Sequence, residues 1–419
     1  MQEHIEAQRA ILVSIAETNR DLPEVEKSLD ELSRLLDTAG GEEFARVVQV
    51  KSSFDVRTCI GSGKVQEVKE LAHNNDIHLV VFDFELSPAQ IRNLEDELDD
   101  VQVIDRSMLI LDIFARHAMT GEGKLQVELA QLKYTAPRLV GKGKELSRLG
   151  GGIGTRGPGE SKLESDKRHL HERLNTLERQ LRELEHNRSV MRAARDRSGI
   201  PKVAIVGYTN AGKSTLLNRL TNAGVLCENK LFATLDPTTR RLILPKGEEV
   251  LLTDTVGFVR KLPHHLVHAF RSTLDEVVYA DIILLVSDIT DLEAEEHIAV
   301  TEELMRDLGA VDKPIIYVYN KCDNLPDFPK EGILRGENKV YISAECGYGI
   351  DLFLSVIENV LGQGKKTVTL HFGYAEQGKV SALHSDATVE NVEYREDGIY
   401  VTATLDGKGL GKYSAYLVE

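Results

Sequence analysis

The sequence predicts an α/β protein built from mostly parallel sheets that are covered by helices. Two observations lead to this fold class. Short apolar, β-branched runs of strand length alternate with amphipathic stretches of helical period through residues 9–119 and again through 199–363. The run at 203–206 also ends at a glycine-bounded loop that opens a helix, which is the order of elements in a doubly wound sheet.

Composition restricts the possible function classes. The 419 residues are enough for several domains, and 42% of them are hydrophobic, which is ample for packed cores. The formal net charge of −16 argues against a simple nucleic-acid coat protein. The charge is uneven, however, because residues 133–202 hold 17 Lys and Arg against 9 Asp and Glu. This local excess predicts one basic surface directed at a polyanion.

Cysteine usage and hydropathy predict a cytoplasmic protein. Cys59, Cys227, Cys322 and Cys346 are scattered without a CxxC pair, which is typical of reduced thiols rather than of a disulfide framework or a zinc site. The N-terminus is polar and acidic, unlike a signal peptide. No apolar run approaches the length of about 18 residues that a membrane span needs, so none is expected.

Residues 1–119 are expected to form an N-terminal α/β domain. Strands are predicted at 10–16, 47–50, 77–82 and 101–104, and helices at 23–36, 88–98 and 108–118. Ser87 stands where it can cap the second of these helices, which has a proline at its first position.

One stretch in this domain imitates a phosphate-binding loop. Residues 60–65 read IGSGKV, but Thr58 and Val65 stand where the motif requires Gly and Ser or Thr. A turn that opens a helix is therefore the preferred interpretation.

Residues 120–198 are expected to form a helical hairpin around a glycine-rich, basic loop. A first, leucine-striped helix is predicted to end at Pro137. Residues 138–161 mix glycines with Arg and Lys and cannot build a packed core, so a mobile loop is predicted. In 162–197, Leu or Met recurs every seven residues, which indicates a seam for antiparallel pairing with the first helix. Considered alone, the arginines of this helix are as consistent with a solvated helix face as with RNA binding. Together with the basic loop they favour contacts to RNA phosphates.

Residues 199–363 are expected to form a P-loop domain with a doubly wound sheet. Strands are predicted at 202–206, 241–244, 249–253, 282–287, 314–319 and 339–342, and helices are predicted to begin near 213, 264, 293 and 350. The sequence GYTNAGKS fits GxxxxGK[ST] between a strand and a helix, where backbone N–H groups cradle phosphates. Lys213 would reach the terminal phosphates, and the Ser214 hydroxyl would bind Mg²⁺. The residues of this loop expected to contact the nucleotide are Gly207, Tyr208, Thr209, Asn210, Ala211, Gly212, Lys213 and Ser214.

Two further motifs follow later strands in the order expected of a GTP-binding protein. In DTVG, Asp254 would hold the Mg²⁺ shell through water, and the Gly257 N–H would point at the γ-phosphate. In NKCD, Asp323 would accept hydrogen bonds from guanine N1–H and the N2 amino group, which adenine lacks, and Asn320 would connect this loop to the phosphate loop. Further contacts with the nucleotide are expected from Thr255, Val256, Lys321, Cys322, Ser343, Ala344 and Glu345.

The first switch is expected between the first helix and the second strand of this domain. Thr234 is the preferred sensor of the γ-phosphate, with Thr238 as the second choice. The neighbours of Thr234 that are expected to bind nucleotide are Phe232, Ala233, Leu235 and Asp236. Many GTPases place a water-orienting Gln directly after DxxG, where this chain has Phe258. The sequence therefore predicts slow intrinsic hydrolysis that a partner accelerates, with His264 and His265 as candidates to help, although a structural role is favoured for both.

Residues 364–419 are expected to form a small α+β C-terminal domain. A strand is predicted at 367–372, a hairpin joins 392–394 to 399–404, and 412–418 is predicted as a last strand. This segment offers no residues that suggest chemistry.

Together these motifs resemble the HflX family of bacterial translation-associated GTPases. The matching stretches are GGGIGTRGPGES (150–161), GYTNAGKST (207–215), FATLDPTTR (232–240), DTVGF (254–258), LPHHLVHAFRSTL (262–274) and NKCD (320–323). The glycine-rich basic loop joined to a long helix is the specific part, since the nucleotide motifs alone would indicate only a GTPase. One departure is His265, where relatives often carry an acidic residue.

The resemblance implies a ribosome-dependent role in a stress response. It implies binding to the large ribosomal subunit and its rRNA through the basic loop 138–161 and the helix 162–197. It also implies GTP-dependent dissociation of stalled or idle ribosomes, hydrolysis stimulated by the ribosome, and Thr234 as a magnesium ligand beside Ser214.

The prediction is thus a cytoplasmic, partly ribosome-associated GTP hydrolase that is a monomer when free and uses GTP/GDP and Mg²⁺. The residues expected to act in hydrolysis are Lys213, Ser214, Thr234 and Gly257. An alternative hypothesis is a nucleotide-switched rRNA-binding or ribosome-assembly factor without splitting activity. An ATP-dependent kinase is disfavoured by Asp323.

Overall fold

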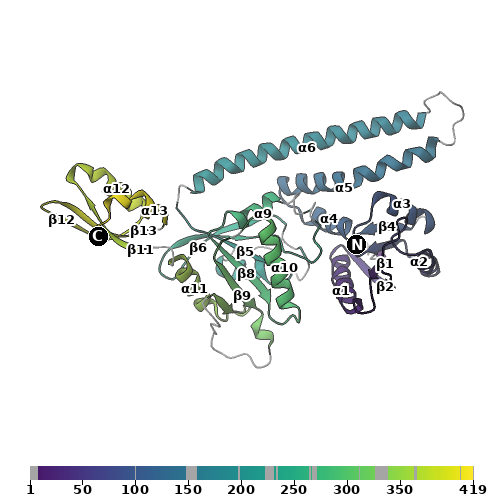
Figure 1. The fold of residues 1–419 in the computed structure, drawn as a ribbon, viewed down its shortest axis with the longest axis horizontal. Coiled ribbons are helices and arrows are strands. Elements are labelled where there is room, and N and C mark those ends of the chain that lie inside the picture. Colours follow the sequence, from purple (N-terminus) through teal and green to yellow (C-terminus); the bar gives the residue numbers. More distant parts are fainter. Residues whose placement is uncertain are drawn as a thin grey trace, which may run out of the picture.

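A computed structural model confirms the α/β class. It describes residues 8–99, 101–147, 158–196, 199–221, 231–232, 235–263, 266, 271–310, 312–325, 338–362, 366–405 and 407–418. Within these residues a four-stranded, a six-stranded and a three-stranded sheet follow one another along the chain, and a long helical hairpin lies across the first two (Figure 1). No helix in this part of the chain is long and apolar enough to cross a membrane.

The N-terminal sheet is parallel throughout, with strand order β2-β1-β3-β4. Its elements are β1 (Gln8–Ala16), α1 (Leu22–Thr38), β2 (Gly41–Val50), α2 (Ser62–Asn75), β3 (Leu79–Phe82), α3 (Pro88–Glu97), β4 (Gln102–Asp105) and α4 (Arg106–His117). Ser87 caps α3 as predicted, because its hydroxyl accepts from the Gln90 N–H. The Gln90 side-chain oxygen in turn accepts from the Ser87 N–H. The IGSGKV stretch is the predicted turn that opens a helix, since α2 begins at Ser62.

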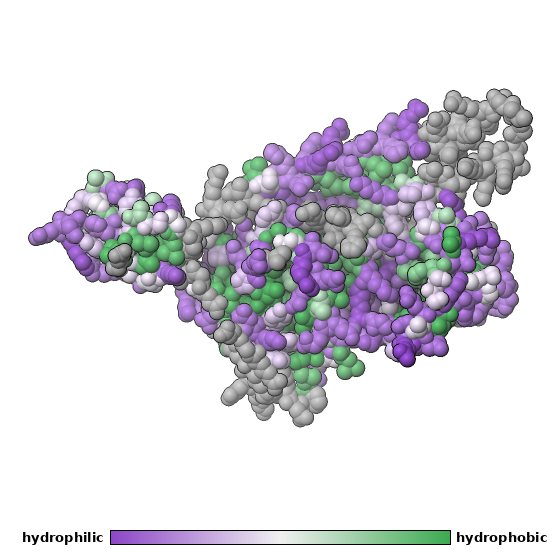
Figure 2. All heavy atoms as spheres, in the orientation of Figure 1, coloured by the Kyte–Doolittle hydropathy of each residue, from purple (hydrophilic) through white to green (hydrophobic). Residues whose placement is uncertain are grey.

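The helical hairpin consists of α5 (Gly121–Ser147) and α6 (Pro158–Asp196), which lie side by side (Figure 1). The predicted seam is confirmed where side chains are described: Leu177 is buried, and Leu170 and Leu184 are half-buried. The outer side of α6 is hydrophilic (Figure 2).

Two predictions about this hairpin are wrong. Pro137 does not end the first helix, because α5 continues to Ser147. A proline removes one backbone hydrogen bond, and pairing with α6 along the hairpin offsets that local loss. Consequently 138–161 is not one loop: 138–147 and 158–161 are helical, and 148–157 lie outside the described residues.

The central sheet has strand order β10-β9-β8-β5-β7-β6 and is parallel except for β6, which runs antiparallel to β7. Its elements are β5 (Lys202–Gly207), α7 (Lys213–Thr221), β6 (Thr238–Ile243), β7 (Glu249–Asp254), α9 (Arg271–Val278), β8 (Ile282–Asp288), α10 (Ala294–Asp307), β9 (Ile315–Asn320), η1 (Cys322–Asn324), β10 (Lys339–Tyr341) and α11 (Ile350–Gly362). The helix start predicted near 264 lies outside the described residues. Strand order reverses at β5, so the loops after β5, β7 and β9 meet at one edge.

The C-terminal sheet is antiparallel with order β11-β13-β12, and the predicted hairpin is confirmed. Its elements are β11 (Lys366–Phe372), η2 (Tyr374–Glu376), α12 (Gln377–Asp386), β12 (Thr388–Arg395), β13 (Gly398–Leu405), α13 (Gly407–Lys412) and η3 (Ser414–Tyr416). The last strand predicted at 412–418 is wrong, because the segment contains the end of α13 and η3. Only Leu417 forms an isolated bridge, to Leu370.

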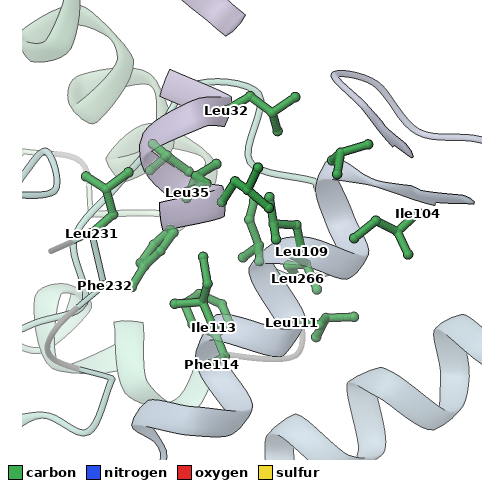
Figure 3. Close-up of a cluster of buried hydrophobic side chains, with 14 of the residues drawn as sticks. Leu32, Leu35, Ile104, Leu109, Leu111, Ile113, Phe114, Leu231, Phe232 and Leu266 are labelled. Atoms are coloured by element: carbon green, nitrogen blue, oxygen red, sulfur yellow. The ribbon is translucent and has the colours of Figure 1, made fainter. Parts of the chain in front are cut away.

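One apolar cluster joins the N-terminal domain to the central domain (Figure 3). Leu35 of α1 and Phe114 of α4 pack with Leu231, Phe232 and Leu266, which come from the two segments flanking β6 and β7. The Phe114 and Phe232 rings meet edge to face with centroids 4.7 Å apart. The expected switch segments therefore form part of the domain interface.

Candidate functional site

The phosphate loop between β5 and α7 depends on two glycines. Gly207 has φ +149°, and a Cβ there would collide with the Val286 carbonyl oxygen. Gly212 has φ +91°, and a Cβ there would collide with Asn320 Nδ2. Only glycine satisfies both the backbone conformation and the close approach. The motif spacing seen in the sequence is thus required by the local geometry.

Lys213 lies buried beneath this loop. Its Nζ donates to the Tyr208 carbonyl oxygen at 2.7 Å. Burial lowers the pKa of Lys213 to about 8. Gly257 lies close by, since a Cβ on it would be 2.9 Å from Lys213 Nζ. The ammonium group and the start of the second switch thus face the same space, where a terminal phosphate is expected.

The end of β7 brings a carboxylate to the start of α7. Ser214 Oγ donates to Asp254 Oδ2 at 2.6 Å, and Asp254 is fully buried. A hydroxyl beside a carboxylate is an oxygen donor set of the kind that Mg²⁺ prefers. Thr255 Oγ1 donates to the Ile205 carbonyl oxygen at 2.7 Å and so attaches this loop to β5.

Asn320 connects the expected base-binding loop to the phosphate loop. Its Nδ2 donates to the Ala211 carbonyl oxygen at 2.9 Å, and its Oδ1 accepts from the Ala344 N–H at 2.9 Å. Asp323 is exposed next to it, and its carboxylate contacts no cation among the described residues. The carboxylate is therefore accessible to a purine edge.

The neighbours of Asp323 are held by the protein itself. Cys322 is buried, and its N–H donates to the Ile342 carbonyl oxygen at 3.2 Å. Lys321 Nζ pairs with Asp288 Oδ2 at 2.7 Å, which places its stem beside the loop. Ser343 is buried, and its hydroxyl accepts from the Cys346 N–H at 3.2 Å. Glu345 is exposed at the same edge.

The first switch differs in part from the sequence-based expectation. Ala233 and Thr234 lie outside the described residues, and Thr238 is the first residue of β6, paired in register with Asp254. Asp236 was expected to bind nucleotide, but it accepts from the Met119 N–H at 2.9 Å and the Thr120 N–H at 2.8 Å, at the start of the hairpin. Phe232 and Leu235 are likewise buried in the interface with the N-terminal domain.

The second switch begins with a short bridge to the phosphate loop. The Phe258 N–H donates to the Gly207 carbonyl oxygen at 3.1 Å, and its carbonyl oxygen accepts from the Thr209 N–H at 2.8 Å. The Phe258 ring is fully buried in the core of the central domain. The side chain that follows DxxG therefore points away from the site as well as lacking a group that could orient water. Val256 packs instead in the interface cluster.

Sequence reasoning missed a set of charged residues buried at the domain interface. Glu31 of α1, Asp83 after β3 and Arg106 of α4 surround Arg260 and Tyr208. One feature of the sequence pointed weakly to this buried charge. Glu31 lies one turn from Ser28 and Leu35 on the apolar face of α1, where a charged residue is unusual.

The chain is similar to known GTPases over nearly its whole length. Three family models match, described as GTP-binding GTPase N-terminal (26–115), GTP-binding GTPase Middle Region (117–195) and 50S ribosome-binding GTPase (202–321). A protein named GTPase HflX from Lacrimispora saccharolytica is 49% identical over 396 residues, covering 94% of this chain and 93% of that protein. GTPase HflX from Caldanaerobacter subterraneus is 51% identical (94% and 90% covered), and that from Escherichia coli is 41% identical (93% and 92% covered). A solved GTP-binding protein from Sulfolobus solfataricus in complex with GDP is 26% identical, covering 85% of this chain and 99% of that one, with a TM-score of 0.43.

Proposed function

This chain belongs to the HflX family of GTPases, and we propose that its GTP cycle controls binding to the large ribosomal subunit and dissociation of stalled or idle ribosomes. The reaction is hydrolysis of GTP to GDP and phosphate. The family model described as a 50S ribosome-binding GTPase, which matches 202–321, supports the subunit as the target. We place the protein in the cytoplasm, as a monomer when it is not bound to ribosomes.

Guanine selection is assigned to the NKCD loop. The exposed Asp323 carboxylate offers two acceptors to the N1–H and N2 amino donors of guanine. Asn320, held between Ala211 and Ala344, keeps this loop at a fixed distance from the phosphate loop. Of the backbone N–H groups of 343–345, those of Ser343 and Ala344 donate to the Tyr348 carbonyl oxygen and to Asn320 Oδ1, so the Glu345 N–H is the proposed donor to guanine O6.

The phosphate end uses the remaining expected residues. The oxygen donors Ser214 and Asp254 fit a magnesium ion, with Thr234 as the proposed second direct ligand and Asp254 acting through water. Bound Mg²⁺ supplies positive charge that offsets the charge of the phosphates. Lys213 turns from the Tyr208 carbonyl to the terminal phosphates, and the Gly257 N–H holds the γ-phosphate. With Phe258 buried, we assign acceleration of hydrolysis to the ribosome.

One observation carries the proposed switch: the two segments expected to sense the nucleotide contribute residues to the interface with the N-terminal domain. Phe232 and Asp236 of the first segment contact α4 and the start of α5. Arg260 of the second contacts α1 and α4. Movement of either segment toward a γ-phosphate must therefore repack this interface. We propose that this repacking sets how the hairpin 120–198 is presented to RNA by the units 1–119 and 199–363.

The cations of α6 divide into two groups. Arg173 pairs with Glu128 at 2.6 Å, and Arg188 pairs with Glu122, so both hold the hairpin together. Three others, Arg168, Arg179 and Arg182, are exposed and form no hydrogen bond or ion pair with the described residues. These three are the proposed phosphate contacts of the helix, beside the basic segment 138–161.

Replacing Arg168, Arg179 and Arg182 together by Ala is expected to weaken binding to purified large subunits in the presence of a non-hydrolysable GTP analogue. Three lost phosphate contacts should reduce the slope of log affinity against log salt by about two. Co-sedimentation at several salt concentrations measures both quantities. The unaltered chain should bind much more weakly with GDP than with the analogue.

The matched control removes the same charge elsewhere, from Arg240, Arg241 and Arg306 on the exposed surface of the central domain. That variant should bind subunits as the unaltered chain does. Equal losses in both triple variants would mean that α6 makes no particular contact. Equal binding of the unaltered chain with the analogue, with GDP and with no nucleotide would end the switch proposal.

A further inference from the structure

Tyr208, the second residue of the phosphate loop, turns its side chain away from the nucleotide site. Its ring stacks on His297 of α10, with centroids 3.7 Å apart and planes 11° from parallel. Its hydroxyl accepts from the Arg260 N–H at 2.7 Å and donates to the buried carboxylate of Glu31. One side chain therefore contacts the second switch and the N-terminal domain, while its own backbone belongs to the phosphate loop.

The Arg260 backbone is held on both sides. Its N–H is bound by Tyr208, and its carbonyl oxygen accepts from Arg106 Nη2 at 3.0 Å. Arg106 is 2% exposed and is itself fixed by Glu31 and by Asp83 at 2.8 Å. Both backbone hydrogen-bonding groups of Arg260, three residues after Gly257, are thus held: the N–H by Tyr208 and the carbonyl oxygen by Arg106 of α4.

The next residues extend the same attachment. The Arg260 side chain pairs with Glu24 of α1 at 3.0 Å and with Glu296 of α10. Lys261 pairs with Asp83 at 2.7 Å and holds a left-handed backbone conformation, φ +50°. Burial raises the pKa of the Glu31 carboxyl, and the positive charge of Arg260 opposes this rise. Buried polar groups of this kind fix one arrangement, because every alternative leaves some of them without partners.

We propose that Tyr208 is a positioning residue for GTP hydrolysis: with Glu31 and Arg106 it fixes the backbone of Arg260 and so the placement of Gly257 beside Lys213. Gly257 directly precedes Phe258, whose N–H donates to the Gly207 carbonyl oxygen, and Arg260 follows two residues after Phe258. Because Phe258 and Arg260 are both held, the backbone just before them is fixed, and the Gly257 N–H is pre-organised for the γ-phosphate, which GDP lacks. The hydroxyl of Tyr208 therefore matters for the chemical step and not for holding the nucleotide.

The test is Tyr208→Phe, which keeps the ring stack on His297 and removes only the hydroxyl. Losing one hydrogen bond of a charged network should lower kcat for GTP by about tenfold. KM for GTP and the affinity for GDP should stay within twofold, because the phosphate loop and the NKCD loop are unchanged. Turnover is measured without ribosomes, so the result does not depend on the ribosomal role proposed above.

Tyr317→Phe is the matched control. Its hydroxyl donates to Glu302 of α10 at 2.7 Å, so a tyrosine–glutamate hydrogen bond is likewise lost in the same domain, but at the contact of β9 with α10 and not with Arg260. This variant should keep the kcat of the unaltered chain. Thermal unfolding of both variants shows whether they are folded to the same extent.

A second variant tests the connection to the other domain. Glu31→Gln should also lower kcat, and the double variant Tyr208→Phe/Glu31→Gln should be no slower than the slower single variant, since both act through Arg260. Three results would overturn the proposal: unchanged or raised kcat in Tyr208→Phe, an equal fall in Tyr317→Phe, or additive losses in the double variant.

Discussion

Replacing Asp323 by Asn is expected to lower the affinity for GTP by about a hundredfold and to create affinity for xanthosine triphosphate. Guanine presents two donors at N1 and N2, and the asparagine amide would turn its NH₂ donor toward one of them. Xanthine has N1–H and an acceptor at C2, which match the amide. Asp323 is exposed and contacts no cation among the described residues, so its replacement disturbs no ion pair there.

Equilibrium binding of fluorescent GTP, ATP and xanthosine triphosphate measures this change. Asp307→Asn, on the exposed end of α10, is the control that removes the same carboxylate charge and should leave all three affinities unchanged. GTP affinity within threefold of the unaltered chain, or equal binding of ATP and GTP by the unaltered chain, would contradict the assignment of Asp323.

Replacing Arg106 by Met is expected to destabilise the folded chain by about 3–5 kcal/mol, because it leaves two buried carboxylates with less compensation. Arg106 contacts Glu31, Asp83 at 2.8 Å and the Arg260 carbonyl at 3.0 Å, all away from solvent. Met fills a similar volume without a charge, so the decrease in the free energy of unfolding reflects the lost ion pairs and hydrogen bonds more than a change in packing. Denaturant unfolding followed by circular dichroism measures the free energy of unfolding.

Arg46→Met is the informative comparison. Arg46 also contacts three carboxylates, Glu26 at 3.2 Å, Asp30 at 2.7 Å and Glu43 at 2.7 Å, but on a partly exposed surface. Solvent screening limits such pairs to under about 1 kcal/mol. A loss for Arg106→Met no larger than that for Arg46→Met would mean that the interface network does not hold the two domains together.

The parts of the fold that follow local rules could be predicted from the sequence. The phosphate loop is one case, since Gly207 and Gly212 need conformations and clearances that only glycine offers. The parallel order of the first sheet is another, because strands and helices alternate there without interruption. The helix cap at Ser87 could be predicted because it involves only residues close to it in the sequence.

The predictions that were wrong depend on neighbours distant in the sequence. Pro137 has the local properties of a helix end, but α6 pairs with the helix that contains it. The segment 412–418 has the apolar pattern of a strand, yet it meets β11 only at its end, through the Leu417 bridge to Leu370 and the Val418 N–H, which donates to the Thr369 carbonyl oxygen. The interface was missed for the same reason. Asp236 accepts a hydrogen bond from the Met119 N–H just before α5, and Tyr208 donates to Glu31. Both contacts can be recognised only when the arrangement of the domains is known.

Light scattering of intact ribosomes mixed with the protein tests the central proposal most directly, because scattering falls when the subunits separate. We expect the scattering to fall with GTP and with a non-hydrolysable analogue, and to stay constant with GDP. A steady signal with GTP, under conditions where co-sedimentation shows the protein bound, would contradict splitting and favour an RNA-binding or assembly factor whose nucleotide only changes affinity.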